Sequence, residues 1–257
     1  YSTMGKTGLE SLVNFHLLSS HVNLMEKIID ELSGEKSTGD NVATTLNLRL
    51  QQTAWDALGD RRGAVIAMEP DTGKVLAMVS KPAFDPNTVE AEWDSLVNGD
   101  SKEARLLNRA TFKVITALEY MREHPGAYDG FHFSCDGIYE YENIRIQCYH
   151  KTAHGEEDFA ASFANSCNGA FASLGLDLDL GRFAKTLLFN RDQPLSIPYK
   201  QSVYQMEADA EDWEIMQTAM GQGSTLMTPM HNLMVMAAIA NDGILMKPYF
   251  VDHVENP

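Results

Sequence analysis

Residues 63–81 place the strongest local constraint on how this chain can fold. Two runs of strand-forming residues, GAVIAM and KVLAMVSK, flank the short segment EPDTG at residues 69–73. Valine and isoleucine favour strands, whereas proline, aspartate and glycine supply the backbone geometry of tight turns. The pattern therefore predicts a β-hairpin, which is a building unit of antiparallel sheets.

Helical patterns surround this hairpin and indicate the fold class. An amphipathic helix is expected from about residue 9 to 32, followed by a polar boundary segment at 33–41. Further helices are expected at 111–123, 156–175, 181–188 and 229–241, and strands at 131–150 and 244–254. A short strand also leads into a helix within residues 42–58. This mixed order favours an α+β fold, in which helices pack on an antiparallel sheet.

The chain is acidic, which bears on its partners. Its 257 residues carry a formal net charge of −16. Because surfaces that bind duplex nucleic acid are normally basic, we expect no nucleic-acid partner. The longest wholly apolar run, Leu233 to Ala240, is too short to span a bilayer.

Lys113 is the first candidate for chemistry. It stands at the start of an apolar helical pattern, TFKVITA, where burial would lower its pKa and make the amine a base. A residue three positions before a lysine shares its helical face, so a serine there could pass its proton to the amine. Taken alone, Lys113 also fits an ordinary surface lysine.

A second candidate is the segment FANSCNGAF at residues 163–171. It places Ser166 and Asn168 two positions apart among small residues. A hydroxyl and an amide at this spacing can relay a proton and hold a substrate carbonyl. A local irregularity in a helix would explain the same residues, so this segment gains weight only together with Lys113.

Together the two segments resemble the first two motifs of the penicillin-recognising serine acyltransferases. These motifs are Ser-x-x-Lys and Ser-x-Asn, and a Lys-Thr-Gly strand follows them. The likeness is collinear over about residues 40–257. It is carried by GAVIAMEPDTGKVLAMVSKPAFDPN, LLNRATFKVITALEYM, TAHGEEDFAASFANSCNGAFASLG and TAMGQGSTLMTPMHNLMVMAAIANDGILMKPYFVDHV. The head, YSTMGKTGLESLVNFHLL, resembles the pedestal connection of class B, monofunctional penicillin-binding proteins.

This resemblance implies a fold and a reaction. The fold is a five-stranded antiparallel sheet flanked by helices, with a transpeptidase domain at 39–257 and a remnant of a pedestal or linker region at 1–38. A serine attacks the D-Ala-D-Ala end of a peptidoglycan stem peptide and passes the acyl group to a neighbouring stem, and β-lactams trap the acyl-enzyme. Lys113 would be the base, Ser166 would relay a proton to the leaving group, and Asn168 would bind the peptide carbonyl. Backbone N–H groups would form the oxyanion hole, and catalysis would need no cofactor.

The resemblance also implies a location and partners. Such an enzyme, here expected from a Gram-positive bacterium, acts on the extracytoplasmic face of the cell membrane through an anchor upstream of Tyr1. It usually works with a membrane glycan polymerase. Two alternatives remain open: a catalytically inactive β-lactam or peptide sensor on the same fold, and a β-lactamase or D,D-carboxypeptidase. The pedestal-like head and the segment GQGSTLMTP favour the transpeptidase.

Two parts of the family pattern are absent from the sequence. The register that fits Lys113 places Ala110 at the position of the nucleophile, and Thr111 lies about 100° further round the helix. The Lys-Thr-Gly motif is also missing, since the KTG at residues 6–8 stands in the wrong chain order without a strand pattern. We expect the natural gene to encode a serine-bearing loop between Arg109 and Lys113. A deliberate deletion and a naturally inactive protein are the alternatives.

A third constellation suits a metal ion. Cys135, Cys148, His150 and His154 stand close together in the sequence. Thiolate and imidazole groups at such separations can build a tetrahedral zinc site. A disulfide between Cys135 and Cys148 and free buried thiols remain open as alternatives. Cys167, inside the Ser-x-Asn motif, is expected to be a small packing residue.

Overall fold

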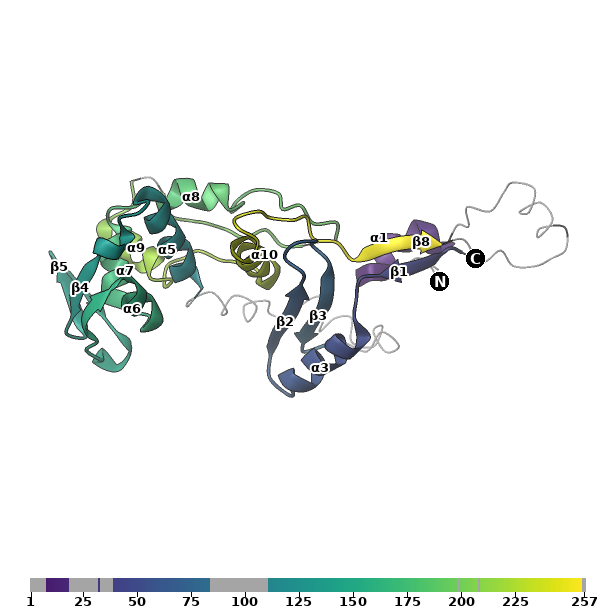
Figure 1. The fold of residues 1–257 in the computed structure, drawn as a ribbon, viewed down its shortest axis with the longest axis horizontal. Coiled ribbons are helices and arrows are strands. Elements are labelled where there is room, and N and C mark those ends of the chain that lie inside the picture. Colours follow the sequence, from purple (N-terminus) through teal and green to yellow (C-terminus); the bar gives the residue numbers. More distant parts are fainter. Residues whose placement is uncertain are drawn as a thin grey trace. The chain divides into compact units, whose positions relative to one another are not determined.

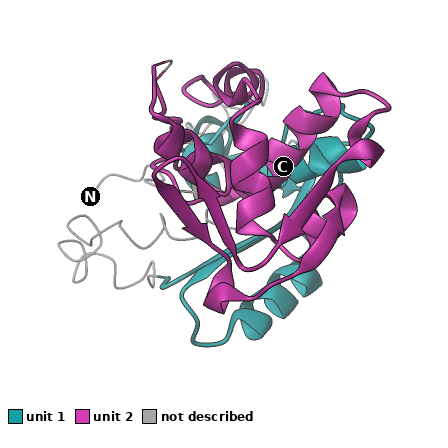
Figure 2. Ribbon diagram, turned by 90° about the vertical axis from the view of Figure 1, so that its left-hand side faces the viewer, with its two compact units in different colours: residues 1–97, 194–200, 233–257 teal, residues 98–193, 201–232 magenta. Residues whose placement is uncertain are grey.

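The structure is a computed structural model, and it describes residues 8–18, 32, 39–83, 111–197, 199–207 and 209–255. The chain divides into two compact units (Figures 1 and 2). Unit 1 comprises residues 1–97, 194–200 and 233–257, and unit 2 comprises residues 98–193 and 201–232. Each unit has its own packed helices and strands.

Unit 1 is built from segments of both ends of the chain. Its elements are α1 (Gly8–Leu18), β1 (Asn41–Thr44), α3 (Leu48–Leu58), β2 (Gly63–Met68), β3 (Val75–Lys81), most of α10 (Pro229–Ala240) and β8 (Val251–Glu255). The hairpin expected at 63–81 is confirmed as the antiparallel pair of β2 and β3. Figure 1 shows β1 beside β8, and these two strands also pair antiparallel.

A glycine in the turn and a glutamine on α3 stabilise the hairpin in unit 1. Gly73 has a φ of +84°, which glycine adopts without strain, and its N–H donates to the carbonyl of Glu69 at 2.9 Å. The side-chain amide of Gln51 on α3 exchanges two hydrogen bonds, of 2.9 and 2.8 Å, with the backbone of Met78 on β3. These two hydrogen bonds anchor helix α3 to strand β3.

Unit 2 contains the segments with the candidate chemistry. Its elements are α5 (Phe112–Glu123), η2 (Tyr128–Gly130), β4 (His132–Cys135), β5 (Ile138–Tyr141), β6 (Ile144–Gln147), η3 (Tyr149–Lys151), β7 (Gly155–Asp158), α6 (Phe159–Ala164), α7 (Asn168–Gly175), α8 (Leu180–Thr186) and α9 (Asp212–Ala219). Strand β4 pairs with β7, and β5 pairs with β6, both antiparallel. Helix α9 had no counterpart among the elements expected from the sequence.

Helix α7 lies in the core of unit 2. Phe171 at its centre is fully buried. A Cβ atom on Gly175 would overlap the Cβ of Ala219, so the absence of a side chain lets α7 and α9 approach closely. Helix α7 also packs against α5 and β6. This packing brings the start of α7 next to the start of α5.

The α+β class expected from the sequence is confirmed, with one difference in the sheet. Among the described residues, the strands pair as two-stranded ladders and do not assemble into a continuous five-stranded sheet. Most of the expected helix at 9–32 and of the boundary at 33–41 lies outside the described residues. No helix in the described ranges is both long and apolar enough to cross a membrane.

Candidate active site

Lys113 lies in the first turn of α5, and its side chain is only 6% exposed. Phe112, Ile115 and Thr116 on the same helix are buried too, so this turn is enclosed by the core. Burial lowers the pKa of the Lys113 amine, and the nearby Cys148 and Cys167 act in the opposite direction. Lys113 is therefore a stronger candidate for a general base than an exposed lysine. 

Two acceptors fix the position of the Lys113 amine. Its Nζ donates to Oδ1 of Asn168 at 3.0 Å and to the carbonyl of Met220 at 2.9 Å. The amide nitrogen of Asn168 donates in turn to the carbonyl of Gln147 at 2.9 Å. Because an ammonium group can only donate, the oxygen of the Asn168 amide must face the lysine. Two residues that are 55 positions apart therefore meet directly.

Ser166 lies in the turn between α6 and α7. Its φ is +52°, a left-handed conformation that a residue with a side chain rarely adopts. Asp158 caps the start of α6, and this helix ends at Ala164 with Asn165 as its C-cap. The single helix expected over 156–175 is therefore wrong, because the range divides into β7, α6, a turn and α7. A left-handed residue cannot continue a right-handed helix.

Lys113, Ser166 and Asn168 line one cavity of unit 2, with a volume of about 410 Å³. The full lining consists of Lys113, Tyr149, His154, Asn165, Ser166, Asn168, Met220 and Gln222. The structure thus brings together the three candidates from the two motifs. Thr111 does not line the cavity, and Ala110 lies outside the described residues.

Four of the lining residues were not among the site residues predicted from the sequence. Gln222 belongs to the segment GQG, whose likeness to the family was a signal that it lies near the site. Asn165 directly precedes Ser166, so its position in the lining follows from the motif. Met220 contributes its backbone carbonyl, which no side-chain pattern reveals. Tyr149 is 81% exposed at the cavity, and its sequence context carries no signal for that position.

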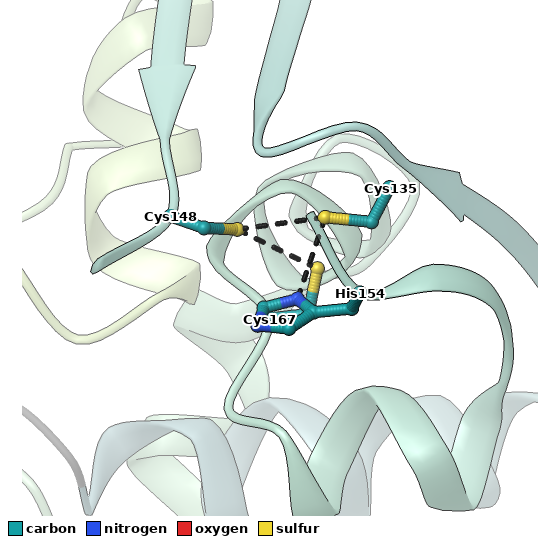
Figure 3. Close-up of side chains that lie close together, drawn as sticks. All are labelled: Cys135, Cys148, His154 and Cys167. Carbon is teal, nitrogen blue, oxygen red and sulfur yellow. Dashed lines mark hydrogen bonds between the residues drawn. The ribbon is translucent and has the colours of Figure 1, made fainter. Parts of the chain in front are cut away.

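A cluster of thiols and an imidazole adjoins the cavity (Figure 3). The Sγ of Cys135 is 3.7 Å from the Sγ of Cys148 and 3.4 Å from Nδ1 of His154. The Sγ of Cys148 is 3.8 Å from the Sγ of Cys167. The four ligand atoms all lie within 4.8 Å of one another. The side chains of the cluster converge on one point, and the three cysteines are free thiols.

The fold of unit 2 gathers these residues from separate elements. Cys135 ends β4, Cys148 follows β6, His154 precedes β7, and Cys167 is the N-cap residue of α7. His150, which the sequence suggested as a ligand, does not belong to the cluster, because it is exposed in the turn η3 with a φ of +53°. Cys167 completes the set of four instead, where the sequence suggested only a packing role.

Comparison with known protein families identifies the family of this chain. Residues 63–256 match the model of the penicillin binding protein transpeptidase domain. The chain belongs to this family. The matched range contains every residue of the cavity and of the Cys/His cluster. Both features therefore lie within the part of the chain that defines a penicillin-binding transpeptidase domain.

Relatives of this penicillin-binding family member have named activities. The chain is 33% identical to the peptidoglycan D,D-transpeptidase PbpA of Mycolicibacterium smegmatis, over 98% of this chain and 56% of that protein. The chain spans about half the length of the curated relatives it matches.

Solved structures confirm the transpeptidase fold. Penicillin-binding protein A from M. tuberculosis, in a ceftriaxone acyl-enzyme complex, aligns with a TM-score of 0.82 at 27% identity. The alignment covers 100% of this chain and 64% of that one. A chain from a peptidoglycan synthase complex that coordinates polymerization and crosslinking aligns with a TM-score of 0.71 at 26% identity, over 86% of this chain and 45% of that one.

Proposed function

We propose that this protein is a peptidoglycan D,D-transpeptidase that works through a serine acyl-enzyme and is inhibited by β-lactams. Its family, the named activity of PbpA and the acyl-enzyme of its structural relative support this function. The observation that carries the proposal is the buried amine of Lys113, which is hydrogen-bonded to Asn168 in the cavity that Ser166 also lines. Serine acyl transfer in this family uses a serine three positions before a lysine with a buried amine, together with a Ser-x-Asn motif.

The proposed chemistry has two half-reactions. In the first, the nucleophilic serine gives its proton to the neutral amine of Lys113 as Oγ attacks the carbonyl of the penultimate D-alanine. The C–N bond to the terminal D-alanine breaks, and Ser166 relays a proton to the leaving nitrogen. The N–H of Asn168 that Gln147 does not use donates to a substrate carbonyl. In the second half-reaction, the amine of a neighbouring stem attacks the ester and gives a proton to Lys113, the C–O bond to the serine breaks, and Lys113 returns the proton to the serine Oγ.

The nucleophile is proposed to lie in a segment that the natural gene encodes between Arg109 and Lys113. Ala110 stands three positions before Lys113 in this sequence, where the reaction needs a serine. Thr111 is the N-cap residue of α5 and does not line the cavity, so it is a poor substitute. The DNA sequence across these positions tests this part of the proposal.

Turnover of a defined substrate tests the function as a whole. The natural protein is incubated with a stem pentapeptide that ends in D-Ala-D-Ala and with an acceptor stem that carries a free amine. We expect release of D-alanine matched by cross-linked product. Lys113→Ala should lower the rate by about 100-fold or more. The control Lys185→Ala, on an exposed lysine of α8, should keep it. D-Alanine without cross-linked product would indicate a carboxypeptidase, and no release would contradict the proposal.

One observation favours a second candidate, a binding module that does not turn over its ligand. This observation is the alanine at position 110. If the natural gene encodes no further residues between Arg109 and Lys113, the protein has no serine three positions before Lys113. Such a protein would bind a stem peptide or a β-lactam in calorimetry without releasing D-alanine and without forming a covalent adduct.

We also propose that the Cys/His cluster binds a structural zinc ion. The two Sγ–Sγ separations, 3.7 and 3.8 Å, fit the edge of a zinc tetrahedron. That edge is about 3.8 Å when the Zn–S bonds are about 2.3 Å. Three thiolates and one imidazole fill the coordination shell, so the ion would stabilise the fold and would leave no position for substrate. The acyl transfer itself needs no cofactor.

Metal analysis separates this proposal from its alternatives. We expect one zinc ion per chain, which a strong chelator removes. Alkylation of three thiols in a metal-free protein would indicate free cysteines, whereas one alkylated thiol would indicate a disulfide.

The organisation and setting of the protein are proposed on the same basis. Residues 1–38 are assigned to a pedestal or linker region and 39–257 to the transpeptidase domain. We place the protein at the extracytoplasmic face of the cell membrane of a Gram-positive bacterium, held by a membrane anchor. The likeness to a chain of a peptidoglycan synthase complex supports a membrane glycan polymerase as its partner.

A further inference from the structure

Glu157 on β7 is a buried acidic residue that the proposed reaction does not use. Its side chain is 2% exposed, and its Oε2 has no hydrogen-bond partner among the described residues. Its neighbours on the same strand, Glu156 and Asp158, are exposed. Burial of a carboxylate is unfavourable unless nearby groups compensate for the lost hydration. The side chains of Asn165 and His154 lie within interaction distance of Glu157.

One oxygen of Glu157 holds the residue that precedes Ser166. Nδ2 of Asn165 donates to Oε1 of Glu157 at 2.8 Å. Asn165 is the C-cap residue of α6, and it lines the cavity. The left-handed conformation of Ser166 persists only where neighbouring contacts enforce it. The hydrogen bond to Glu157 fixes the turn before Ser166, and the buried Cys167 fixes it after Ser166.

The same oxygen lies beside the imidazole of the Cys/His cluster. Oε1 of Glu157 is 3.8 Å from Nδ1 of His154, and this nitrogen is 3.4 Å from the Sγ of Cys135. His154 also lines the cavity. Glu157 therefore contacts both the turn that carries Ser166 and the cluster behind it.

We infer that Glu157 is a positioning residue: through Asn165 it holds Ser166 in its left-handed turn at the cavity. This role rests on the proposed function of Ser166 as a proton relay. The contact with Asn165 acts whether or not the cluster binds a metal. A misplaced relay slows bond breaking but leaves the first, non-covalent encounter with the ligand unchanged.

Acylation kinetics of the natural protein test the contact with Asn165. Stopped-flow measurements with a chromogenic β-lactam give the non-covalent Kd and the acylation rate constant separately. Glu157→Leu and Asn165→Ala should each lower the rate constant about 10- to 100-fold, since a small misplacement of a catalytic group has effects of this size. Their Kd values should stay within about twofold of the parent value, whereas general loosening of the site would raise them.

Two further variants sharpen the test. The double variant Glu157→Leu/Asn165→Ala should be no slower than the slower single variant, because both changes remove the same hydrogen bond. Glu156→Gln changes the exposed neighbour on the same strand and should leave the rate constant unchanged. A parental rate constant in Asn165→Ala, or additive losses in the double variant, would overturn the role of Glu157. Asn165 is exposed, so Asn165→Ala leaves the core intact. This variant therefore tests the role of Glu157 even if Glu157→Leu does not fold.

A natural protein that forms no acyl-enzyme would overturn the proposed function and the role of Glu157 with it.

Discussion

At the scale of single residues, the site depends on a lysine that burial makes less basic. The pKa of Lys113 lies below its ordinary value of 10.5. Because only the neutral amine can accept the proton of the serine, acylation by a β-lactam should rise with pH as Lys113 deprotonates and then level off. Stopped-flow rates over about pH 5 to 11 measure this profile. A flat profile, or a midpoint at or above 10.5, would contradict the role of Lys113 as base.

His231 permits a test of stability against pH. It is buried, its Nε2 lies 2.6 Å from the carbonyl of Leu187, and burial lowers its pKa from 6.5. The unfolded state therefore binds more protons below pH 6.5, so the folded state should lose stability as the pH falls through this region. His231→Gln keeps a donor for Leu187 and cannot titrate. Thermal unfolding at about pH 7 and 5 should show a smaller loss in this variant, and equal losses would contradict the account.

Sequence reasoning revealed individual residues where their chemistry is distinctive. Lys113, Ser166 and Asn168 stood out because their spacing matches known motifs. The exchange of His150 for Cys167 in the cluster was not predictable, because the turn η3 and the start of α7 decide which side chain points inward. Glu157 sits in the acidic run GEED, and only the pairing of β7 with β4 determines which of these carboxylates is buried.

At the scale of elements, the close contact of α7 and α9 makes a stability prediction. Gly175→Ala would place a Cβ on top of the Cβ of Ala219. We expect it to lower the free energy of unfolding by about 1–3 kcal/mol through overpacking. Ala219→Gly should recover part of this loss in the double variant, because it removes the atom that clashes. Urea denaturation checks both values, and a double variant that shows only the sum of two losses would contradict the contact.

Elements with strong local signals were predicted, and elements set by tertiary contacts were not. The hairpin of β2 and β3 follows from its turn residues, and α5 and α10 follow from their apolar patterns. The range 156–175 is rich in small and helix-compatible residues, so its local pattern predicts one helix. Its division at Ser166 depends on contacts from Glu157 and from the buried Cys167, which are remote from any local pattern.

At the scale of the whole molecule, the Cys/His cluster ties together four elements of unit 2. Removal of the proposed zinc ion should lower the Tm of the natural protein, since a ligand that binds only the folded state contributes about 2.7 kcal/mol at 100 times its Kd. Cys167→Ser should weaken zinc binding by about tenfold or more. His150→Ala should leave it unchanged, which makes this variant the matched control. A weakened site in His150→Ala, with parental affinity in Cys167→Ser, would contradict the arrangement of the cluster.

The central claim is serine acyl transfer at the cavity of unit 2, and mass spectrometry of the natural protein treated with penicillin G tests it most directly. The intact protein should gain the mass of one whole penicillin molecule, and peptide mapping should place it on a serine three positions before Lys113. Lys113→Ala should form this adduct about 100-fold more slowly or not at all. A natural protein that gains no mass, or gains it on a residue outside this segment, would contradict the claim.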